Sequence, residues 1–303
     1  MCERGLKMKG KEFIRKTGGS HTPPLKENKY INEDGSELKY LTFPVFDKFK
    51  FISHAMTTRE GGVSTGCFES MNLSFTRGDD VPSVNENYER ICKALGIEKS
   101  RIVCVDQKHT STVRVVKEED AGKGVTRQLD YREVDGHITN VKGLALAIFF
   151  SDCIPVFFVD PVNKAIGLAH SGWRGTVGRI GKVMVEKMTE EYGSRPADLI
   201  CGIGPSVCRD CYEISEDVAE EFRREVPGHV EELVMEKEGI GSFRKYQLDL
   251  WAANRIVLEE AGVPGENIHV TDICTCCNPD LLFSHRVHNQ ARGNNTGFLM
   301  LNY

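Results

Sequence analysis

The sequence lacks an uninterrupted apolar segment of the roughly 18 residues that a membrane-spanning helix requires. Its best apolar run, from Gly143 to Phe150, continues only after a polar break, from Ile154 to Val159, and is typical of buried strands. The first residues carry basic side chains but no apolar core of a secretory signal. These absences predict a cytoplasmic protein that does not use a membrane as its partner.

Long blocks of one charge sign are also missing, and the formal net charge of the 303 residues is -5. Proteins that bind nucleic acid usually carry a basic patch, so nucleic acid is not an expected partner. The eleven cysteines are an odd number in a chain without an export signal, which argues against a disulfide framework. We expect the thiols to be buried residues, metal ligands or catalysts.

No tandem repeat or low-complexity linker divides the chain. Residues 1–40 are polar and rich in Lys, Glu, Gly and Pro, which predicts an extension in which the segment KEFIRK could add an edge strand. Residues 41–303 are predicted to form one domain.

Apolar spacing predicts helices and strands in irregular order. The expected helices are Ser83–Leu95, Thr176–Tyr192, Ser215–Val226 and Leu248–Ala261, and the expected strands are Thr112–Val116, Leu144–Phe150, Val156–Val159 and Ala165–Ala169. Because strands and helices do not alternate regularly, the pattern favours an α+β layered fold over a doubly wound one.

The chemistry concentrates around a turn at residues 160–164, DPVNK. Cys153 begins the strand before this turn and His170 ends the strand after it. A hairpin centred between Pro161 and Val162 would place the two residues opposite each other, with Cβ atoms about 4.5–5.5 Å apart. Such a pair could ligate a metal, act as nucleophile and base, or be a buried thiol beside a core histidine.

Two glycine-containing segments could bind an anion. In Ser171-Gly172-Trp173-Arg174-Gly175-Thr176, glycines precede a helix N-terminus, whose free N–H groups could receive phosphate. The segment matches neither a P-loop nor GxGxxG, and a plain strand-to-helix turn explains it equally well. In TTREGGVS, Arg59 beside two glycines could contact an oxyanion or could be a solvated loop arginine.

His109, which follows Gln107-Lys108, and the turn-like Asp135-Gly136-His137 carry little information by themselves. A lone histidine before a strand is more often structural than a ligand. The pattern alone therefore assigns neither segment a catalytic role.

The fragments acquire meaning from their order along the chain. They are TTREGGVSTGCFESMNLS, VDQKH, VDGHITN, GLALAIFFSDCIPVFFVDP, AIGLAHSGWRGT, CGIGPSVCRDCYEI and CTCCNPDLLFSHR. From about residue 45 to the C-terminus the chain resembles the laccase-domain family, also called multicopper polyphenol oxidoreductase-like and described as purine nucleoside phosphorylases. SDC followed by AHSGWRG is the specific part.

The resemblance implies a metal site made of His109, Cys153 and His170, with zinc as the metal and copper as the alternative. It also implies a monomer with a single-domain α/β/α-type α+β sandwich and a mixed sheet, similar to a toxin-like cysteine hydrolase. Ser151 and Ser171 stand where the family usually has alanine. The tail differs more, because Arg286 is kept whereas Phe298 replaces a later arginine.

The implied reaction is phosphorolysis of adenosine, inosine or methylthioadenosine to the free base and (methylthio)ribose 1-phosphate, with adenosine deaminase side activity. Arg59, Arg286 and the turn containing Gly172 and Arg174 are the candidate phosphate contacts, and His109, Cys153 and His170 are the candidate catalytic residues. Zinc could orient phosphate, polarise the substrate or supply hydroxide for deamination.

Three other functions stay open. A copper polyphenol oxidase would need a His-rich cluster, whereas the nine histidines are scattered without a His-x-His pair. A cysteine hydrolase or amidase acting on cell-wall precursors would use Cys153 and His170 as a dyad and be inhibited by zinc. A non-catalytic zinc-binding protein would show no turnover that depends on Cys153.

A second group of cysteines could hold a structural zinc. Cys208 and Cys211 have the spacing of half a zinc site, whereas Cys274, Cys276 and Cys277 are spaced more tightly than usual. Buried unpaired thiols are therefore the preferred interpretation.

Overall fold

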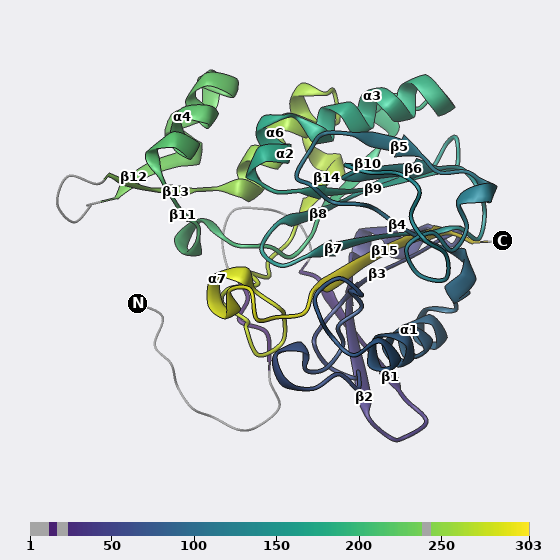
Figure 1. The fold of residues 1–303 in the computed structure, drawn as a ribbon. Helices are drawn as coiled ribbons and strands as arrows, with labels where there is room; N and C mark the ends of the chain where they lie inside the picture. Colours follow the sequence, from purple (N-terminus) through teal and green to yellow (C-terminus); the bar gives the residue numbers. More distant parts are fainter. Residues whose placement is uncertain (1–11, 17–23, 238–243, 303) are drawn as a thin grey trace.

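Two six-stranded sheets lie face to face in the computed structural model, which describes residues 12–16, 24–237 and 244–302 (Figure 1). Helices cover the outer face of each sheet, so the layers run helix, sheet, sheet, helix. The expected α+β class with mixed sheets is confirmed. The expected sandwich has one sheet layer, whereas the structure has two, which bury one face of each sheet against the other.

The first sheet is antiparallel except for one edge pair, β4 and β7. In spatial order its strands are β1 (Lys26–Ile31), β2 (Glu37–Thr42), β3 (Ile52–Thr57), β15 (Asn295–Leu301), β7 (Ala145–Phe150) and β4 (Ile102–Cys104). The C-terminal strand β15 thus lies in the middle of a sheet that the N-terminal hairpin extends.

The second sheet has parallel pairs at both edges and antiparallel strands in its centre. Its order is β14 (Ile268–Val270), β10 (Ile200–Ile203), β8 (Ile154–Asp160), β9 (Ala165–Ser171), β6 (Gly136–Thr139) and β5 (Val113–Val115). Every residue of β8 and β9 is buried, as expected for continuous apolar runs in central strands.

Seven α-helices and a small third sheet complete the described part of the chain. The helices are α1 (Val81–Leu95), α2 (Trp173–Val177), α3 (Ile180–Tyr192), α4 (Glu216–Glu225), α5 (Val230–Leu233), α6 (Leu250–Glu260) and α7 (His285–His288). The third sheet has the order β11 (Glu213–Ile214), β13 (Lys245–Leu248) and β12 (Val234–Lys237). None of the described helices is long and apolar enough to cross a membrane.

Three apolar cores separate the four layers. One lies between the two sheets, one packs α3 and α6 against the second sheet, and one packs α1 against the first sheet. α1 ends where it was expected to end, because Gly96 adopts the left-handed conformation after Leu95. It begins at Val81, two residues before the expected start, because the Asp80 carboxylate caps the helix by accepting a hydrogen bond from the Ser83 N–H.

Two sequence predictions need correction. The single helix expected at Thr176–Tyr192 is interrupted at Gly178 and Arg179, because Arg179 adopts a left-handed conformation with φ 57°. The β8–β9 hairpin has Pro155 opposite His170 rather than Cys153 opposite His170. This shift is two residues along one strand and preserves the face on which side chains lie, because side chains alternate with a period of two.

The boundary expected at residue 40 falls inside β2, so strands on both sides of it belong to the first sheet. Within KEFIRK, Arg15 forms an isolated antiparallel bridge with Ile273. Lys11, the first residue of this segment, lies outside the described residues.

Candidate metal centre

The open end of the β8–β9 hairpin brings Cys153 and His170 together with a histidine from a distant loop. His109 lies between β4 and β5, Cys153 directly precedes β8, and His170 is the penultimate residue of β9. One donor atom of each residue lies within 4.8 Å of the others. The Sγ atom of Cys153 is 3.8 Å from Nε2 of His109, and the two imidazole ring centres are 5.0 Å apart.

Asp135 organises two of these three residues. Its carboxylate accepts hydrogen bonds from the backbone N–H groups of Lys108, His109 and Thr110 at 2.9 to 3.1 Å. The same carboxylate lies 2.9 Å from Nδ1 of His170. This contact orients the imidazole ring and leaves Nε2 of His170 as the atom available to ligate a metal, an arrangement usual around metal-bound histidines.

The protonation of the site is governed by these contacts. Burial alone raises the pKa of the Cys153 thiol, but the His170 and His109 imidazoles stabilise the thiolate and lower the pKa to about 6. Burial lowers the pKa of His170, but the Cys153 thiolate and Asp135 raise it to about 9. Burial raises the pKa of Asp135, whereas its hydrogen bonds lower it to about 2. The site therefore stabilises a thiolate, which is the metal-binding form of cysteine.

One donor residue and one neighbour of a donor residue have unusual backbone conformations. His109 and Asp152 both have positive φ values, 62° and 85°. The conformation of Asp152 is held by hydrogen bonds to its carboxylate from Thr275 Oγ1 at 2.5 Å and from the Arg286 N–H at 2.7 Å. Such conformations cost energy and concentrate at functional sites, where the surrounding structure maintains them.

Gly172 is in close contact with the donor residues. A Cβ atom at this position would lie 2.9 Å from Cys153 Sγ and 2.9 Å from His109 Cδ2. Only a residue without a side chain permits this approach. A thiolate and two imidazoles, held this close with one ring nitrogen oriented by a carboxylate, suit a zinc ion with an open fourth position.

A cavity of about 370 Å³ opens onto the three donors, a size within the usual range for small-molecule sites. Phe75, Leu129 and Phe149 supply apolar lining, and Phe75 stacks on the buried ring of Tyr88. The cavity thus combines an apolar lining with the three candidate metal donors.

Two arginines that the sequence interpretation missed also line this cavity, Arg77 and Arg292. Arg77 donates to the Arg292 and Gln290 carbonyls, and Arg292 Nη1 donates to Asn294 Oδ1 at 2.7 Å. Among the described residues neither forms an ion pair with a carboxylate, and Nε of Arg292 is buried without a hydrogen-bond partner. Burial and the charge of Arg77 lower the pKa of Arg292 to about 10. Two adjacent cations, neither of them ion-paired with a carboxylate of the described residues, favour an anion.

The arginines predicted from the sequence lie outside the cavity lining. Arg59 donates to the Glu69 and Pro279 carbonyls and lies over the Phe283 ring.

Arg174 lies over the ring of Trp173, and Arg286 lies over Tyr212 while donating to the Glu213 carbonyl. Gly172 is beside the donors but not among the cavity-lining residues. No motif singled out Arg77 or Arg292, because they come from different loops, 215 positions apart.

Known proteins are similar to this chain over most of its length. Residues 53–302 match the model of a family described as multi-copper polyphenol oxidoreductase laccase. A protein of Bacillus subtilis (strain 168) named purine nucleoside phosphorylase YlmD is 36% identical over 251 residues, covering 82% of this chain and 88% of the relative. A protein of an unknown prokaryotic organism named adenosine deaminase RL5 is 32% identical over 234 residues, covering 77% of this chain and 87% of the relative.

The fold is shared as well. The crystal structure of YlmD from Geobacillus stearothermophilus superposes with a TM-score of 0.79 at 34% sequence identity, covering 87% of this chain and 96% of that chain.

Proposed function

The chain belongs to the multi-copper polyphenol oxidoreductase laccase family, and from this membership and the cavity we propose that it is a zinc-dependent purine nucleoside phosphorylase. The observation that carries the proposal is the cavity that joins three metal donors to two arginines lacking a carboxylate partner among the described residues. Relatives named for phosphorolysis and for adenosine deamination support the substrate class. We propose a cytoplasmic location, because a reducing environment keeps thiols such as that of Cys153 available for metal binding.

The proposed reaction transfers the ribosyl group of adenosine or inosine, or the methylthioribosyl group of methylthioadenosine, from the base to phosphate. Arg77 and Arg292 bind the phosphate dianion, because guanidinium groups donate paired hydrogen bonds to phosphate oxygens. Phe75 and Phe149 pack against the purine ring and exclude water from the cavity. His109, Cys153 and His170 would hold zinc, which as a Lewis acid polarises a bound oxygen or lowers the pKa of water.

Asp135 is a positioning residue in this scheme. It holds His170 through Nδ1 and fixes the His109 loop through three backbone N–H groups. The same arrangement supports adenosine deamination as a side activity, since a water molecule activated in the cavity can attack the purine ring.

The test is a phosphate-dependence assay of the zinc-loaded protein with adenosine and inosine, with products separated by chromatography. We expect free base and ribose 1-phosphate only when phosphate is present. Cys153→Ala should abolish both products, whereas Cys67→Ala, which removes an exposed thiol, should not. Inosine formed from adenosine without phosphate would identify deamination as the principal reaction, and no turnover of either nucleoside would refute the proposal.

The phosphate contacts are tested by a matched pair of arginine variants. Arg292→Ala is expected to reduce kcat/KM for phosphate about 10- to 100-fold, because hydrogen bonds from charged groups contribute about 1.5–3 kcal/mol. Arg174→Ala should change this value little, since Arg174 lies over Trp173 and outside the cavity lining. Equal effects of both substitutions would contradict the assignment, provided that circular dichroism shows both variants to be folded.

A thiol hydrolase is the second candidate, because the same side chains place a stabilised thiolate beside an imidazole that is paired with Asp135. Zinc distinguishes the two functions. It should activate the phosphorylase, whereas it should inhibit an amidase that needs Cys153 as a free nucleophile. Cell-wall peptides would be the substrates to try if nucleosides fail.

A further inference from the structure

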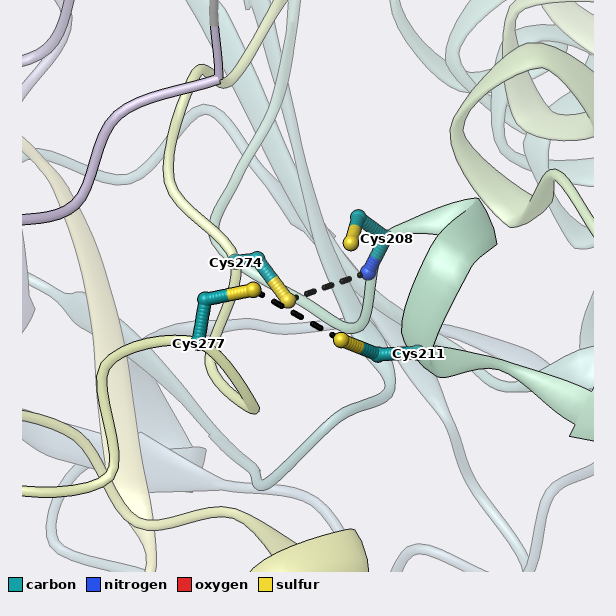
Figure 2. Close-up of side chains that lie close together, drawn as sticks. All are labelled: Cys208, Cys211, Cys274 and Cys277. Carbon is teal, nitrogen blue, oxygen red and sulfur yellow. Dashed lines mark hydrogen bonds between the residues drawn. The ribbon is translucent and has the colours of Figure 1, made fainter. Parts of the chain in front are cut away.

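Four cysteines outside the nucleoside cavity converge from two loops that are far apart in the sequence (Figure 2). Cys208 and Cys211 follow β10, and Cys274 and Cys277 follow β14. These two strands are parallel neighbours, so their carboxyl ends leave the same edge of the second sheet. We name these four residues the four-cysteine cluster.

The structure selects which cysteines belong together. One sulfur atom from each of the four lies within 4.8 Å of the others, while Cys276 is outside this group. Leaving out Cys276 turns the second segment into Cys274-x-x-Cys277, which repeats the spacing of Cys208-x-x-Cys211. Two Cys-x-x-Cys pairs are the typical ligand pattern of a structural zinc site. The tight spacing of the second group of cysteines, which argued against a metal site in the sequence, therefore no longer applies.

The sulfur separations also suit a single metal ion. Zinc–sulfur bonds of about 2.3 Å in a tetrahedron place the sulfur atoms about 3.8 Å apart. Sγ of Cys211 is 3.5 Å from Sγ of Cys277, and no pair within the cluster exceeds 4.8 Å. A polynuclear iron–sulfur cluster would hold its cysteine sulfurs further apart, because several iron and sulfide atoms lie between them.

The surroundings of the cluster can stabilise negative charge. Four thiols that bind one Zn²⁺ release four protons and leave a site with a charge of -2, as the sum of +2 and four thiolates requires. The Cys208 N–H donates to Sγ of Cys274 at 3.2 Å, and the Cys211 N–H donates to the Cys208 carbonyl, closing the turn. The Lys16 ammonium, which pairs with Asp210, is close enough to Cys208 and Cys277 to attract them electrostatically.

From this convergence we propose that Cys208, Cys211, Cys274 and Cys277 form a tetrathiolate site for one structural zinc ion, distinct from the catalytic donors. Cys208 and Cys274 are buried and the other two are half-buried, so the four thiols offer a closed set without an open position for substrate. Closed sites of four cysteines serve to hold chain segments together.

The segments held together are those that support Asp152, the neighbour of Cys153. Val207, adjacent to Cys208, donates its N–H to the Asp152 carbonyl at 3.1 Å. Thr275, adjacent to Cys274, donates its hydroxyl to the Asp152 carboxylate at 2.5 Å. A zinc ion in the cluster therefore fixes two of the residues that position Asp152 and stabilises the loop that carries the catalytic thiol.

The experiment counts metal in intact protein purified under reducing conditions. Elemental analysis and native mass spectrometry should give two zinc ions per wild-type chain. Cys153→Ala and Cys208→Ser should each retain one zinc, and the double variant should retain none. Cys276→Ser is the matched control, because it changes a thiol in the same loop outside the cluster, and it should retain two.

Spectroscopy of Cys153→Ala keeps the proposal testable even if Cys208→Ser fails to fold. Its remaining zinc should show four sulfur ligands at about 2.3 Å by X-ray absorption. A zinc-free Cys153→Ala protein, iron in place of zinc, nitrogen or oxygen ligands, or a Cys211–Cys277 disulfide found by peptide mass mapping would each overturn the proposal. None of these measurements depends on turnover, so failure of the phosphorylase assay leaves their outcome unchanged.

Discussion

Replacing Gly172 by alanine is expected to displace the proposed metal donors without removing a donor or a hydrogen bond. Gly172 has φ -82° and ψ -178°, an extended conformation that alanine adopts freely. The added Cβ atom would lie 2.9 Å from both Cys153 Sγ and His109 Cδ2. Because favourable contacts between carbon atoms begin near about 3.5 Å, the donors must move by roughly 0.6 Å.

A movement of this size exceeds the roughly 0.5 Å tolerance of a catalytic site. A misplacement of about 1 Å can reduce activity about 100-fold, so we expect Gly172→Ala to reduce zinc affinity and kcat/KM by about 10- to 100-fold. Zinc affinity is measured by competition with a chelating dye, and activity is measured by release of free base. Alanine keeps the backbone N–H, so a lost N–H donor would not explain the decrease.

Gly175→Ala is the matched control for this substitution. Gly175 lies in the same turn, within α2, and its added Cβ atom would meet its nearest neighbour, the Thr110 carbonyl oxygen, at 3.5 Å. This is ordinary contact, and alanine favours a helix by about 0.5–1 kcal/mol relative to glycine. Wild-type zinc affinity in Gly172→Ala, or an equal loss in Gly175→Ala, would refute the argument.

Two further predictions concern Asp135 and the buried histidines. Asp135→Asn should lower zinc affinity about 10- to 100-fold in the same dye competition, because loss of a carboxylate behind a metal-bound histidine typically has that effect; unchanged affinity would contradict the positioning role. Burial lowers the pKa of His54 to about 3, and burial together with the Arg114 charge lowers the pKa of His137 to about 3. Below about pH 6.5 the unfolded chain therefore binds more protons than the folded protein, and stability falls with acidification. Each histidine should lower the free energy of unfolding by about 2 kcal/mol at pH 5. His137→Leu, which also removes two unpaired buried nitrogens, should therefore reduce the difference between the unfolding free energies that urea denaturation gives at pH 7.5 and pH 5. An unchanged difference would contradict the assignment.

Local sequence signals predicted much of the secondary structure. α1 begins at the Asp80 cap and ends at Gly96, and α4 and α6 agree with the expected helices to within two residues at either end. The hairpin between β8 and β9 exists, but its register differs by two residues because the turn geometry, rather than the midpoint of the two functional residues, sets the pairing. The break between α2 and α3 was missed because apolar spacing continues across it.

The residues of the candidate site could be predicted only in part from local sequence signals. His109, Cys153 and His170 were predicted as metal ligands through motif order, since spacing alone favoured a buried structural pair over a metal site or a nucleophile with its base. The sequence showed Asp135 only as part of a turn, and its hydrogen bonds to the His109 loop and to His170 are evident only in the tertiary structure.

The sequence by itself determined the chemical character of this protein: apolar central strands, a thiol and an imidazole at the end of a hairpin, and more cysteines than one metal site needs. Tertiary structure decided which of these groups act together. Arg77 and Arg292 share a cavity although 215 positions separate them, and the parallel neighbours β10 and β14 deliver four thiols to one sheet edge. Local patterns determine whether each segment forms a helix, a strand or a turn. Strand order determines where the ends of those segments meet, and it depends on contacts between residues that are distant in sequence.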